Sequence, residues 1–403
     1  MDNQPEGKNL ELFWNVQFIY ELGLAMMELE SFGVEYTTQN GLRTFAALEI
    51  PDVEKFSNRT AYFQKIDNQS TLYSKLVTKN VTRSINQYLT HWIYPYKGKF
   101  HPQMIRSLLN YMKVNPGETI FDPFIGSGTA ALEAQLLGIN CIGVDISEVC
   151  YLVSSVKTES FNYISQLKLQ LEDFIKFLLE NKRDDVESVI SNKVAEIEKN
   201  EIRNFFRVAE LIAHSDKSRR RKKDFSNSFL VNSNKMLTST IDYANCIEEN
   251  NLSLGDVTIY NNDARELEFP EKHFDGIVTS PPYSIALNYV DNDKHALKSL
   301  GYDIEKIKDD FIGVRGKGSA KVELYNEDMK KAYTEMDRVL KSGKYCTIII
   351  GNARIDKEEI QTVEKTIEIF KNMNYKLEKN IEKIIFGLYN IMQKENILIF
   401  KKQ

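Results

Sequence analysis

The sequence lacks any long apolar run. Its 403 residues contain no uninterrupted stretch of about 18 apolar residues, the length that a membrane-spanning helix requires. The first residues, MDNQPEGKNLELFW, also lack the basic stretch and the apolar stretch that together mark a secretory signal. We therefore expect a cytoplasmic protein that has no membrane partner.

Cysteine is scarce, and no two cysteines have a spacing typical of metal ligands. The four cysteines, Cys141, Cys150, Cys246 and Cys346, form no CxxC motif. This absence argues against a zinc site and against a disulfide framework, and it is typical of proteins in a reducing cytoplasm. No metal site is predicted.

An excess of positive charge is missing as well. The formal net charge is -5 at pH 7, which does not indicate a general nucleic-acid binder. Any surface that binds nucleic acid must therefore be a local patch of basic residues.

Strand-like and helix-like segments alternate in two parts of the chain, residues 91–150 and 255–403. The pattern predicts strands over 118–124, 140–147, 256–263, 274–280 and 344–352, and helices over 126–138, 325–343 and 358–373. Such alternation predicts an α/β fold, a doubly wound Rossmann-like sheet of mostly parallel strands. A short turn region separates the last two predicted strands, 375–386 and 396–402, which implies an antiparallel strand at the C-terminal end.

Two further segments do not follow this alternation. Residues 1–90 form an N-terminal extension, with a helix predicted over 10–30 and strands over 43–50 and 59–66. Residues 151–254 have helical periodicity and many charges, and they are too long for an ordinary crossover between parallel strands. We therefore predict a helical insertion at this point, as a subdomain or a lid.

A glycine turn, FDPFIGSGT at residues 121–129, follows the first strand of the α/β pattern. Gly126 and Gly128 allow a tight turn and a close approach of the backbone to a ligand. Asp145 ends the next predicted strand, where a carboxylate can bind both hydroxyls of a ribose. The two features predict a cofactor that contains a nucleoside, against the alternative of a plain turn that begins a helix. A P-loop is excluded, because no Gly-Lys-Ser or Gly-Lys-Thr follows the glycines.

Two more acidic residues bear on which cofactor binds. Asp122 ends the strand just before the glycines, where an anion repels a pyrophosphate and attracts a cation. S-adenosylmethionine carries an ammonium and a sulfonium, so it is favoured over NAD. Asp263 follows the next predicted strand, at the same edge of the sheet. It either accepts a hydrogen bond from the adenine amine of the cofactor or caps the turn that follows.

The segment TSPPY, residues 279–283, places two prolines and a tyrosine at the end of a predicted strand. Together with FDPFIGSGT and GVDIS, in this order, it resembles the exocyclic-amino DNA methyltransferases that use S-adenosylmethionine. The Ser-Pro-Pro-Tyr form is similar to the N4-cytosine branch, whereas Asp-Pro-Pro-Tyr is commoner in the overlapping N6-adenine branch. HWIYPYKGKFHPQMI, residues 91–105, resembles the element that precedes the glycine turn in this family. An ordinary proline turn is the alternative.

The resemblance implies a class I methyltransferase sheet and a target base held at the corner. The Ser280 side chain and the Pro281 carbonyl would accept hydrogen bonds from the target amine, and Pro281 and Pro282 would fix these acceptors. The flipped base would stack on Tyr283. Pro-Cys does not occur in the chain, which argues against C5-cytosine chemistry. The residues that would bind the cofactor are Lys99, Phe100, His101, Asp122, Pro123, Phe124, Gly126, Ser127, Gly128, Thr129, Asp145, Ile146, Asp263 and Ala264.

Double-stranded DNA is the implied partner, with a restriction endonuclease as a functional partner. We expect no recognition domain after the last strand, so the N-terminal extension, the insertion or the loop over 313–321 would read the target. The basic residues that could contact phosphates are Arg219, Arg220, Arg221, Lys222, Lys223, Arg315, Lys317 and Lys321. A solvated run of charge is the alternative for the first five. Methylation of tRNA, a non-catalytic cofactor-binding module and, more distantly, an NAD oxidoreductase remain the alternative functions.

Overall fold

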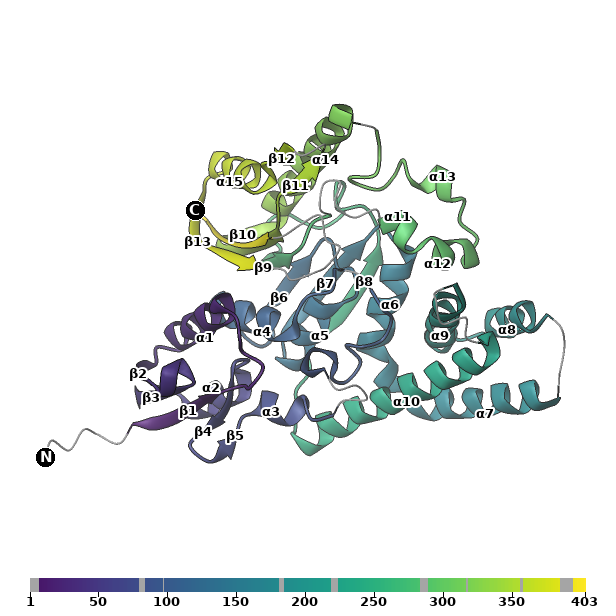
Figure 1. Cartoon of the computed structure of the whole chain (residues 1–403), viewed down its shortest axis with the longest axis horizontal. Helices are drawn as coiled ribbons and strands as arrows, with labels where there is room; N and C mark the ends of the chain where they lie inside the picture. The colour runs from purple at the N-terminus through teal and green to yellow at the C-terminus, as the bar shows by residue number, and fades with distance from the viewer. Residues whose placement is uncertain are drawn as a thin grey trace, which may run out of the picture.

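A seven-stranded sheet forms the centre of the protein (Figure 1). The computed structural model describes residues 7–79, 84–96, 98–180, 185–218, 224–282, 289–316, 318–355, 358–384 and 394–403. The strands of the sheet are β6 (Thr119–Asp122), β7 (Asn140–Asp145), β8 (Val257–Asn261), β9 (Phe274–Thr279), β10 (Leu340–Ile350), β13 (Tyr375–Ile384) and β14 (Lys394–Lys402).

The order of the strands, β13-β14-β10-β9-β6-β7-β8, defines where a ligand can bind. From β6 the chain runs outward through β7 and β8, and it then returns to the other side of β6 to form β9 and β10, all of them parallel. The order therefore reverses between β6 and β9, and in such sheets ligands bind beyond the carboxyl ends at the reversal. β14 lies antiparallel between β10 and β13. The predicted doubly wound α/β sheet with its antiparallel C-terminal strand is confirmed.

Both faces of the sheet are buried, because successive residues of the central strands point to opposite faces. Ile120 and Val278 belong to the core on one side, and Phe121 and Ile277 belong to the core on the other. The first side is covered by α4 (Pro102–Tyr111) and α5 (Thr129–Leu136), and α6 (Glu148–Glu159) contacts β7 and β8. The second side is covered by α14 (Gly318–Val339) and α15 (Thr362–Asn372), beside a small hairpin of β11 (Ala353–Ile355) and β12 (Glu358–Ile360).

The N-terminal segment forms a second, antiparallel sheet with the order β2-β3-β1-β4-β5. The predicted helix over 10–30 is wrong at its start, because Lys8–Leu12 forms β1 and α1 begins only at Ile19. Leu10 and Leu12 are buried on one side of β1, which pairs with β3 and β4. The partner strands lie far along the chain, so strand pairing determines the structure of residues 8–12, although the local apolar spacing fits a helix. The other elements are β2 (Glu35–Gln39), η1 (Asn40–Leu42), β3 (Thr44–Glu49), β4 (Phe63–Ile66), β5 (Gln69–Ser70), α1 (Ile19–Ser31), α2 (Val53–Arg59), α3 (Leu72–Leu76) and η2 (Ile85–Gln87).

A buried carboxylate ties this N-terminal sheet to the central one. Glu28 of α1 accepts hydrogen bonds from the Thr60 hydroxyl, from the backbone of Ala61 and Tyr62, and from the amide of Asn110 on α4. Apolar residues of the N-terminal sheet, α4 and α5 also form one continuous core. The N-terminal segment therefore packs directly on the helices that cover the central sheet.

Helices fill the segment between β7 and β8. Figure 1 shows α7 to α10 grouped at one side of the central sheet, beside α6. They enclose a core of their own, in which Phe174, Phe206 and Phe229 contact one another. The predicted boundary between residues 150 and 151 lies inside α6. The helices are η3 (Ser160–Tyr163), α7 (Ile164–Glu180), α8 (Val186–Ala195), α9 (Asn200–Ser218) and α10 (Phe225–Glu249).

The chain after the proline corner packs on these helices. The described part comprises α11 (Tyr289–Asn292), α12 (Lys294–Ser299) and α13 (Ile304–Ile307), and α12 contacts both α6 and α9. The predicted loop over 313–321 is helical from Gly318 on, because α14 begins there, about two turns before its first buried residue, Tyr325. Across the described ranges, no helix is long and apolar enough to cross a membrane.

Candidate active site

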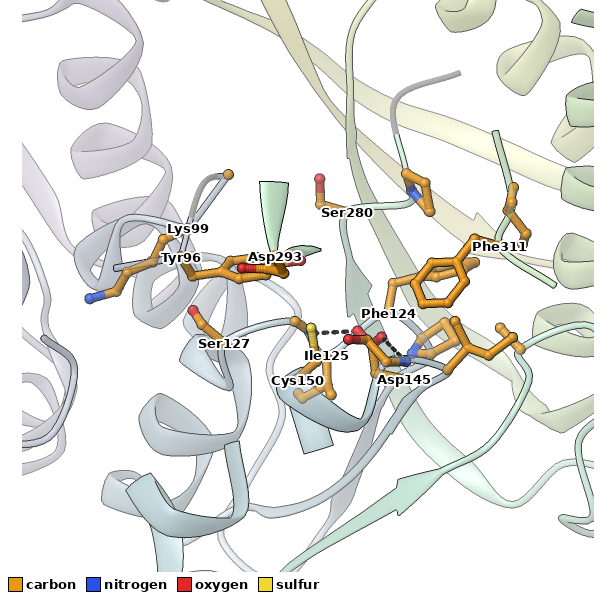
Figure 2. Close-up of a pocket in the computed structure, with 18 of the residues that line it drawn as sticks. Tyr96, Lys99, Phe124, Ile125, Ser127, Asp145, Cys150, Ser280, Asp293 and Phe311 are labelled. Atoms are coloured by element: carbon orange, nitrogen blue, oxygen red, sulfur yellow. Dashed lines mark hydrogen bonds between the residues drawn. The ribbon is translucent and has the colours of Figure 1, made fainter. Parts of the chain in front are cut away.

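A cavity lies beyond the carboxyl ends of β6, β7, β8 and β9, where the strand order reverses (Figure 2). Its empty volume is about 950 Å³ when the part open to solvent is included. The predicted site residues that line it are Lys99, Phe100, Pro123, Phe124, Gly126, Ser127, Thr129, Asp145, Ile146, Asp263, Ala264, Ser280 and Pro282.

Five predicted site residues do not line this cavity or were not placed. His101 precedes α4 as its N-terminal cap residue, and burial lowers its pKa to about 4. Asp122, Gly128 and Pro281 are buried next to lining residues in the sequence. Tyr283 lies outside the described residues.

The glycine turn has a geometry that only glycine adopts without strain. Gly126 and Gly128 have φ angles of 51° and 76°, in the left-handed region that L side chains rarely occupy. A Cβ at position 126 would lie 3.2 Å from the Tyr96 ring, and one at position 128 would lie 2.8 Å from the Ser154 Cβ. The turn is therefore packed closely against Tyr96 and Ser154, and its residues Gly126, Ser127 and Thr129 line the cavity.

Asp145 is held in place by the glycine turn. Its two carboxylate oxygens accept hydrogen bonds from the backbone N–H groups of Gly126 and Ser147, both at 2.9 Å. Burial raises its pKa to about 6 in spite of these bonds. The Cys150 thiol is a third donor, so about one of the four acceptor positions of the carboxylate remains for a ribose hydroxyl.

Asp122 joins the glycine turn to the proline corner. Its Oδ1 accepts hydrogen bonds from the Thr279 hydroxyl at 2.6 Å and from the Phe124 N–H at 3.1 Å. Its Oδ2 is buried and has no hydrogen-bond partner among the described residues. Burial raises its pKa to about 7, and the charge of Asp145 adds to this rise. A cation bound nearby would favour the ionised form.

The raised pKa of Asp122 predicts a specific dependence of stability on pH. An Asp whose pKa is higher in the folded state than in the unfolded chain contributes stability at low pH, and this stability is lost as the pH rises through the folded value. For a change from 3.8 to about 7, the loss amounts to roughly 4 kcal/mol at most, incurred between about pH 4 and 7.

The neutral variant Asp122→Asn tests this expectation. Since the amide does not titrate, the unfolding free energy of the variant relative to that of the native chain should increase between pH 5 and pH 8. Urea unfolding at several pH values, without cofactor, measures this difference. Two curves that run parallel over this range would contradict the ionisation of a buried Asp122.

Asp263 lines the cavity, but its carboxylate binds within the chain. It accepts hydrogen bonds from the backbone N–H of Arg265 and from the guanidinium of the same residue, which also pairs with Asp328. The sequence left two roles open for Asp263, a hydrogen bond from the adenine amine and a cap of the following turn. These contacts favour the cap. An adenine amine would have to share this carboxylate with the Arg265 guanidinium.

Hydrogen bonds of Lys99 and His91 hold the segment before α4 in place. Lys99 lines the cavity with its stem, while its Nζ donates to the backbone carbonyls of Asn86 and His91, and Figure 2 shows Nζ pointing away from the cavity. Burial lowers the pKa of Lys99 to about 7. His91 in turn binds Glu133 of α5, so the segment is fixed to the helix that begins at the glycine turn.

Ser280 has a defined hydrogen-bond role at the corner. Its hydroxyl donates to the backbone carbonyl of Ile349 in β10, at 2.9 Å. With its proton directed to β10, the oxygen can act as a hydrogen-bond acceptor toward the cavity. A hydroxyl oxygen whose proton is held by a backbone carbonyl suits a substrate that carries N–H donors.

Several lining residues were not predicted. Tyr96, Gly98, Ile125, Ser147 and Cys150 lie within or next to the recognised motifs, so their positions could have been inferred. The others come from the segment after the corner, where no motif marks them: Asp293, Leu297, Phe311 and Ile312. Phe311 and Phe124 line the apolar end of the cavity in Figure 2, opposite Lys99 and Ser127.

Two of the predicted phosphate contacts, Arg315 and Lys321, lie in the described part of the chain, and Arg315 has a partner there. The Arg315 guanidinium pairs with Asp328 at 2.5 Å, and burial lowers the pKa of Lys321. Lys317 and residues 219–223 lie outside the described residues. A phosphate contact by Arg315 would therefore compete with an existing ion pair.

These features suit a nucleoside cofactor that carries positive charge. The glycine turn lines the cavity, Asp145 keeps acceptor capacity for a ribose hydroxyl, and the fully buried Asp122 has an oxygen with no partner among the described residues. Phe124, Ile146 and Phe311 provide apolar surface for a purine. Among the residues that the structure describes, no three His, Cys, Asp or Glu side chains are grouped so that they could hold a metal ion.

Three curated proteins are similar to parts of this chain. The type II methyltransferase M.BsoBI of Geobacillus stearothermophilus is 34% identical over 113 residues, 28% of this chain and 22% of its own length. The type II methyltransferase M.MjaII of Methanocaldococcus jannaschii is 30% identical over 163 residues, 37% of this chain and 29% of its own length. The tRNA (guanine(10)-N2)-dimethyltransferase of the same organism is 27% identical over 103 residues, 25% of this chain and 29% of its own length.

The matches thus span less than a third of each relative. Two family comparisons cover more of this chain. Residues 93–307 match the RMKL-like methyltransferase domain, and residues 3–155 match the DNA methylase family of N6 and N4 methyltransferases. The chain therefore belongs to the RMKL-like methyltransferases, which use S-adenosylmethionine, and it shares residues 3–155 with the N6 and N4 DNA methylases.

Proposed function

We propose that this methyltransferase transfers a methyl group to the exocyclic amine of a base in double-stranded DNA, with N4 of cytosine as the preferred target. The observation that carries the proposal is the Ser280 hydroxyl, which donates to Ile349 and so offers its oxygen as an acceptor at the cavity. An exocyclic amine is a poor nucleophile, because its lone pair is delocalised into the ring. Acceptors that bind its N–H bonds favour the pyramidal form that can attack.

The chemistry needs no covalent enzyme intermediate. When bound, S-adenosylmethionine supplies a methyl group on a positively charged sulfur. The nitrogen lone pair would form the new N–C bond, and the C–S bond would break with its electron pair left on sulfur. One N–H proton of the methylated nitrogen then leaves to water. Ser280 and the Pro281 carbonyl would orient the amine throughout, and Tyr283 would stack on a base rotated out of the duplex.

The biological context of the proposal is restriction and modification in the cytoplasm. It is supported by the match of residues 3–155 to the DNA methylases and by two type II methyltransferases among the relatives. A restriction endonuclease of the same specificity would be the functional partner. The serine in place of aspartate at the corner favours cytosine N4 over adenine N6.

Methylation of a tRNA base is the second candidate. A tRNA (guanine(10)-N2)-dimethyltransferase is similar over 103 residues, and guanine N2 is also an exocyclic amine. The Ser280 acceptor suits all three amines, so the corner alone does not separate DNA from RNA. The N-terminal sheet or the helical insertion would then bind the RNA.

A transfer assay distinguishes the two candidates. We expect the full chain, with methyl-labelled S-adenosylmethionine, to label genomic DNA that lacks modification and to leave tRNA unlabelled. Modification-sensitive sequencing of DNA from cells that express the chain should then give the base and the recognition sequence. Labelling of tRNA alone would overturn the DNA proposal in favour of the second candidate, and labelling of neither would favour a non-catalytic module.

A further inference from the structure

Asp293 places a carboxylate in the cofactor cavity that no motif of the sequence marks. It precedes α12 as the N-terminal cap residue, a position where aspartate usually binds the first backbone N–H groups of the helix. Its side chain makes no such bond here. Its Oδ1 instead accepts a hydrogen bond from the Tyr94 hydroxyl, at 2.6 Å. The side chain is thus directed to the cavity rather than to its own helix.

The charge of Asp293 acts on the part of the cavity that would hold the ribose. Burial is the main cause that raises the pKa of both Asp145 and Cys150, and the charge of Asp293 adds to the rise in each case. Cys150 also forms a hydrogen bond to Asp145. Asp293 therefore lies within electrostatic reach of Asp145, the carboxylate assigned to the ribose.

Figure 2 draws Asp293 next to Tyr96, to the left of Ser280 and Asp145 and at a height between them. All four residues line the same cavity. The covalent order of S-adenosylmethionine is adenine, ribose, sulfonium, and then the methyl group that leaves toward the target. If Asp145 binds the ribose and Ser280 binds the target amine, the group between them is the sulfonium.

We propose that the Asp293 carboxylate faces the sulfonium of bound S-adenosylmethionine and stabilises its positive charge. The proposal rests on the roles of Asp145 and Ser280 given above, but not on the identity of the target base. Opposite charges attract more strongly in a partly buried site than in water, because the surroundings screen them less. Asp293 would therefore favour the charged cofactor over its neutral product, S-adenosylhomocysteine, and so assist the exchange of product for cofactor.

The surroundings of Asp293 keep this carboxylate in position. Tyr94 belongs to the segment before the glycine turn, and it is buried. Leu297, one turn further along α12, lines the cavity and joins the core of the helical insertion, to which α9 also contributes. The insertion thus supports a residue of the cofactor site, in addition to any contact with nucleic acid.

Cofactor affinity alone tests the proposal, without any nucleic acid. Titration calorimetry of the full chain with S-adenosylmethionine and with S-adenosylhomocysteine compares ligands that differ at sulfur in charge and one methyl group. We expect Asp293→Asn to weaken binding of the charged cofactor by about tenfold or more and binding of the neutral product by less than about twofold. Tyr94→Phe, which removes the donor to Asp293, should shift the ratio in the same direction by less.

Asp291→Asn is the matched control, because it removes the same charge two residues away at an exposed position. It should leave the affinity for both ligands unchanged. Equal loss of both affinities in Asp293→Asn, or no loss of either, would overturn the proposal. A loss of S-adenosylmethionine affinity in Asp291→Asn of the same size would also overturn it, since a general field effect would then explain the result. None of these outcomes depends on whether DNA is the substrate.

Discussion

Replacing Ser280 with alanine is expected to lower the rate of methyl transfer by about 10²- to 10³-fold at saturating cofactor. The expected size is that of removing one pre-positioned hydrogen-bond partner from a transition state. The Ser280 oxygen lies at the cavity, and its proton is directed to Ile349, so the substitution removes an acceptor and adds no bulk. The measurement is single-turnover transfer to a substrate that the native chain methylates.

Two further measurements separate a catalytic role of Ser280 from a structural one. Affinity for S-adenosylmethionine and the melting temperature of Ser280→Ala should remain close to those of the native chain, because losing the hydrogen bond to Ile349 costs only about 1 kcal/mol. Ser280→Asp restores an acceptor and produces the Asp-Pro-Pro form of the corner, so it should recover part of the rate. An alanine variant with an unchanged rate would remove Ser280 from the mechanism.

Replacing Glu133 with alanine is expected to lower the free energy of unfolding by about 3–5 kcal/mol, the range for removing one partner of a buried ion pair. Glu133 is fully buried on α5, where it accepts hydrogen bonds from Arg106 at 3.2 Å, from His91 at 2.8 Å and from the Tyr88 hydroxyl. Its pKa is lowered by these partners in spite of burial, so the carboxylate is ionised. The alanine variant would leave the Arg106 charge buried without its carboxylate.

Glu133→Ala should also weaken the binding of the cofactor. Residues 88–100 run from the Glu133 cluster to the cavity, so cofactor affinity should fall together with stability. Urea unfolding and calorimetry on the same samples measure both. Glu133→Gln keeps one acceptor oxygen and should lose less, whereas Glu172→Ala, at an exposed position in the helix α7, should change stability by less than about 0.5 kcal/mol. A Glu133→Ala variant as stable as the control would show that the cluster does not support the fold.

The core of the site could be predicted because its parts are local. The glycine turn, the strand-ending Asp145 and the proline corner each lie within a few residues of a strand end. In a parallel sheet the carboxyl ends of the strands meet at one edge, so their order in the sequence was enough to bring them together. The alternation of strands and helices likewise predicted the sheet, and the short connection between the last two strands predicted the antiparallel one.

Other predictions were wrong or stayed untested where contacts with residues distant in the sequence determine the structure. The apolar run over 10–30 matched a helix, but β1 forms from its first residues because β3 and β4 supply strands on either side. Asp263 could have met an adenine amine, but Arg265 occupies its carboxylate, and Asp328 holds Arg265 in turn. The roles of Tyr283 and of the basic run 219–223 remain predictions, since these residues lie outside the described structure.

The sequence by itself determined the fold class, the cofactor class and most of the residues that line the cavity, because these depend on short motifs at strand ends. Only the tertiary structure decided that the Ser280 hydroxyl donates to β10 and that Asp293 enters the cavity from the segment after the corner. Both depend on contacts between residues far apart in the chain, Ser280 with Ile349 and Asp293 with Tyr94. The order and spacing of residues in the sequence do not show such contacts, since the packing of the whole chain brings those residues together.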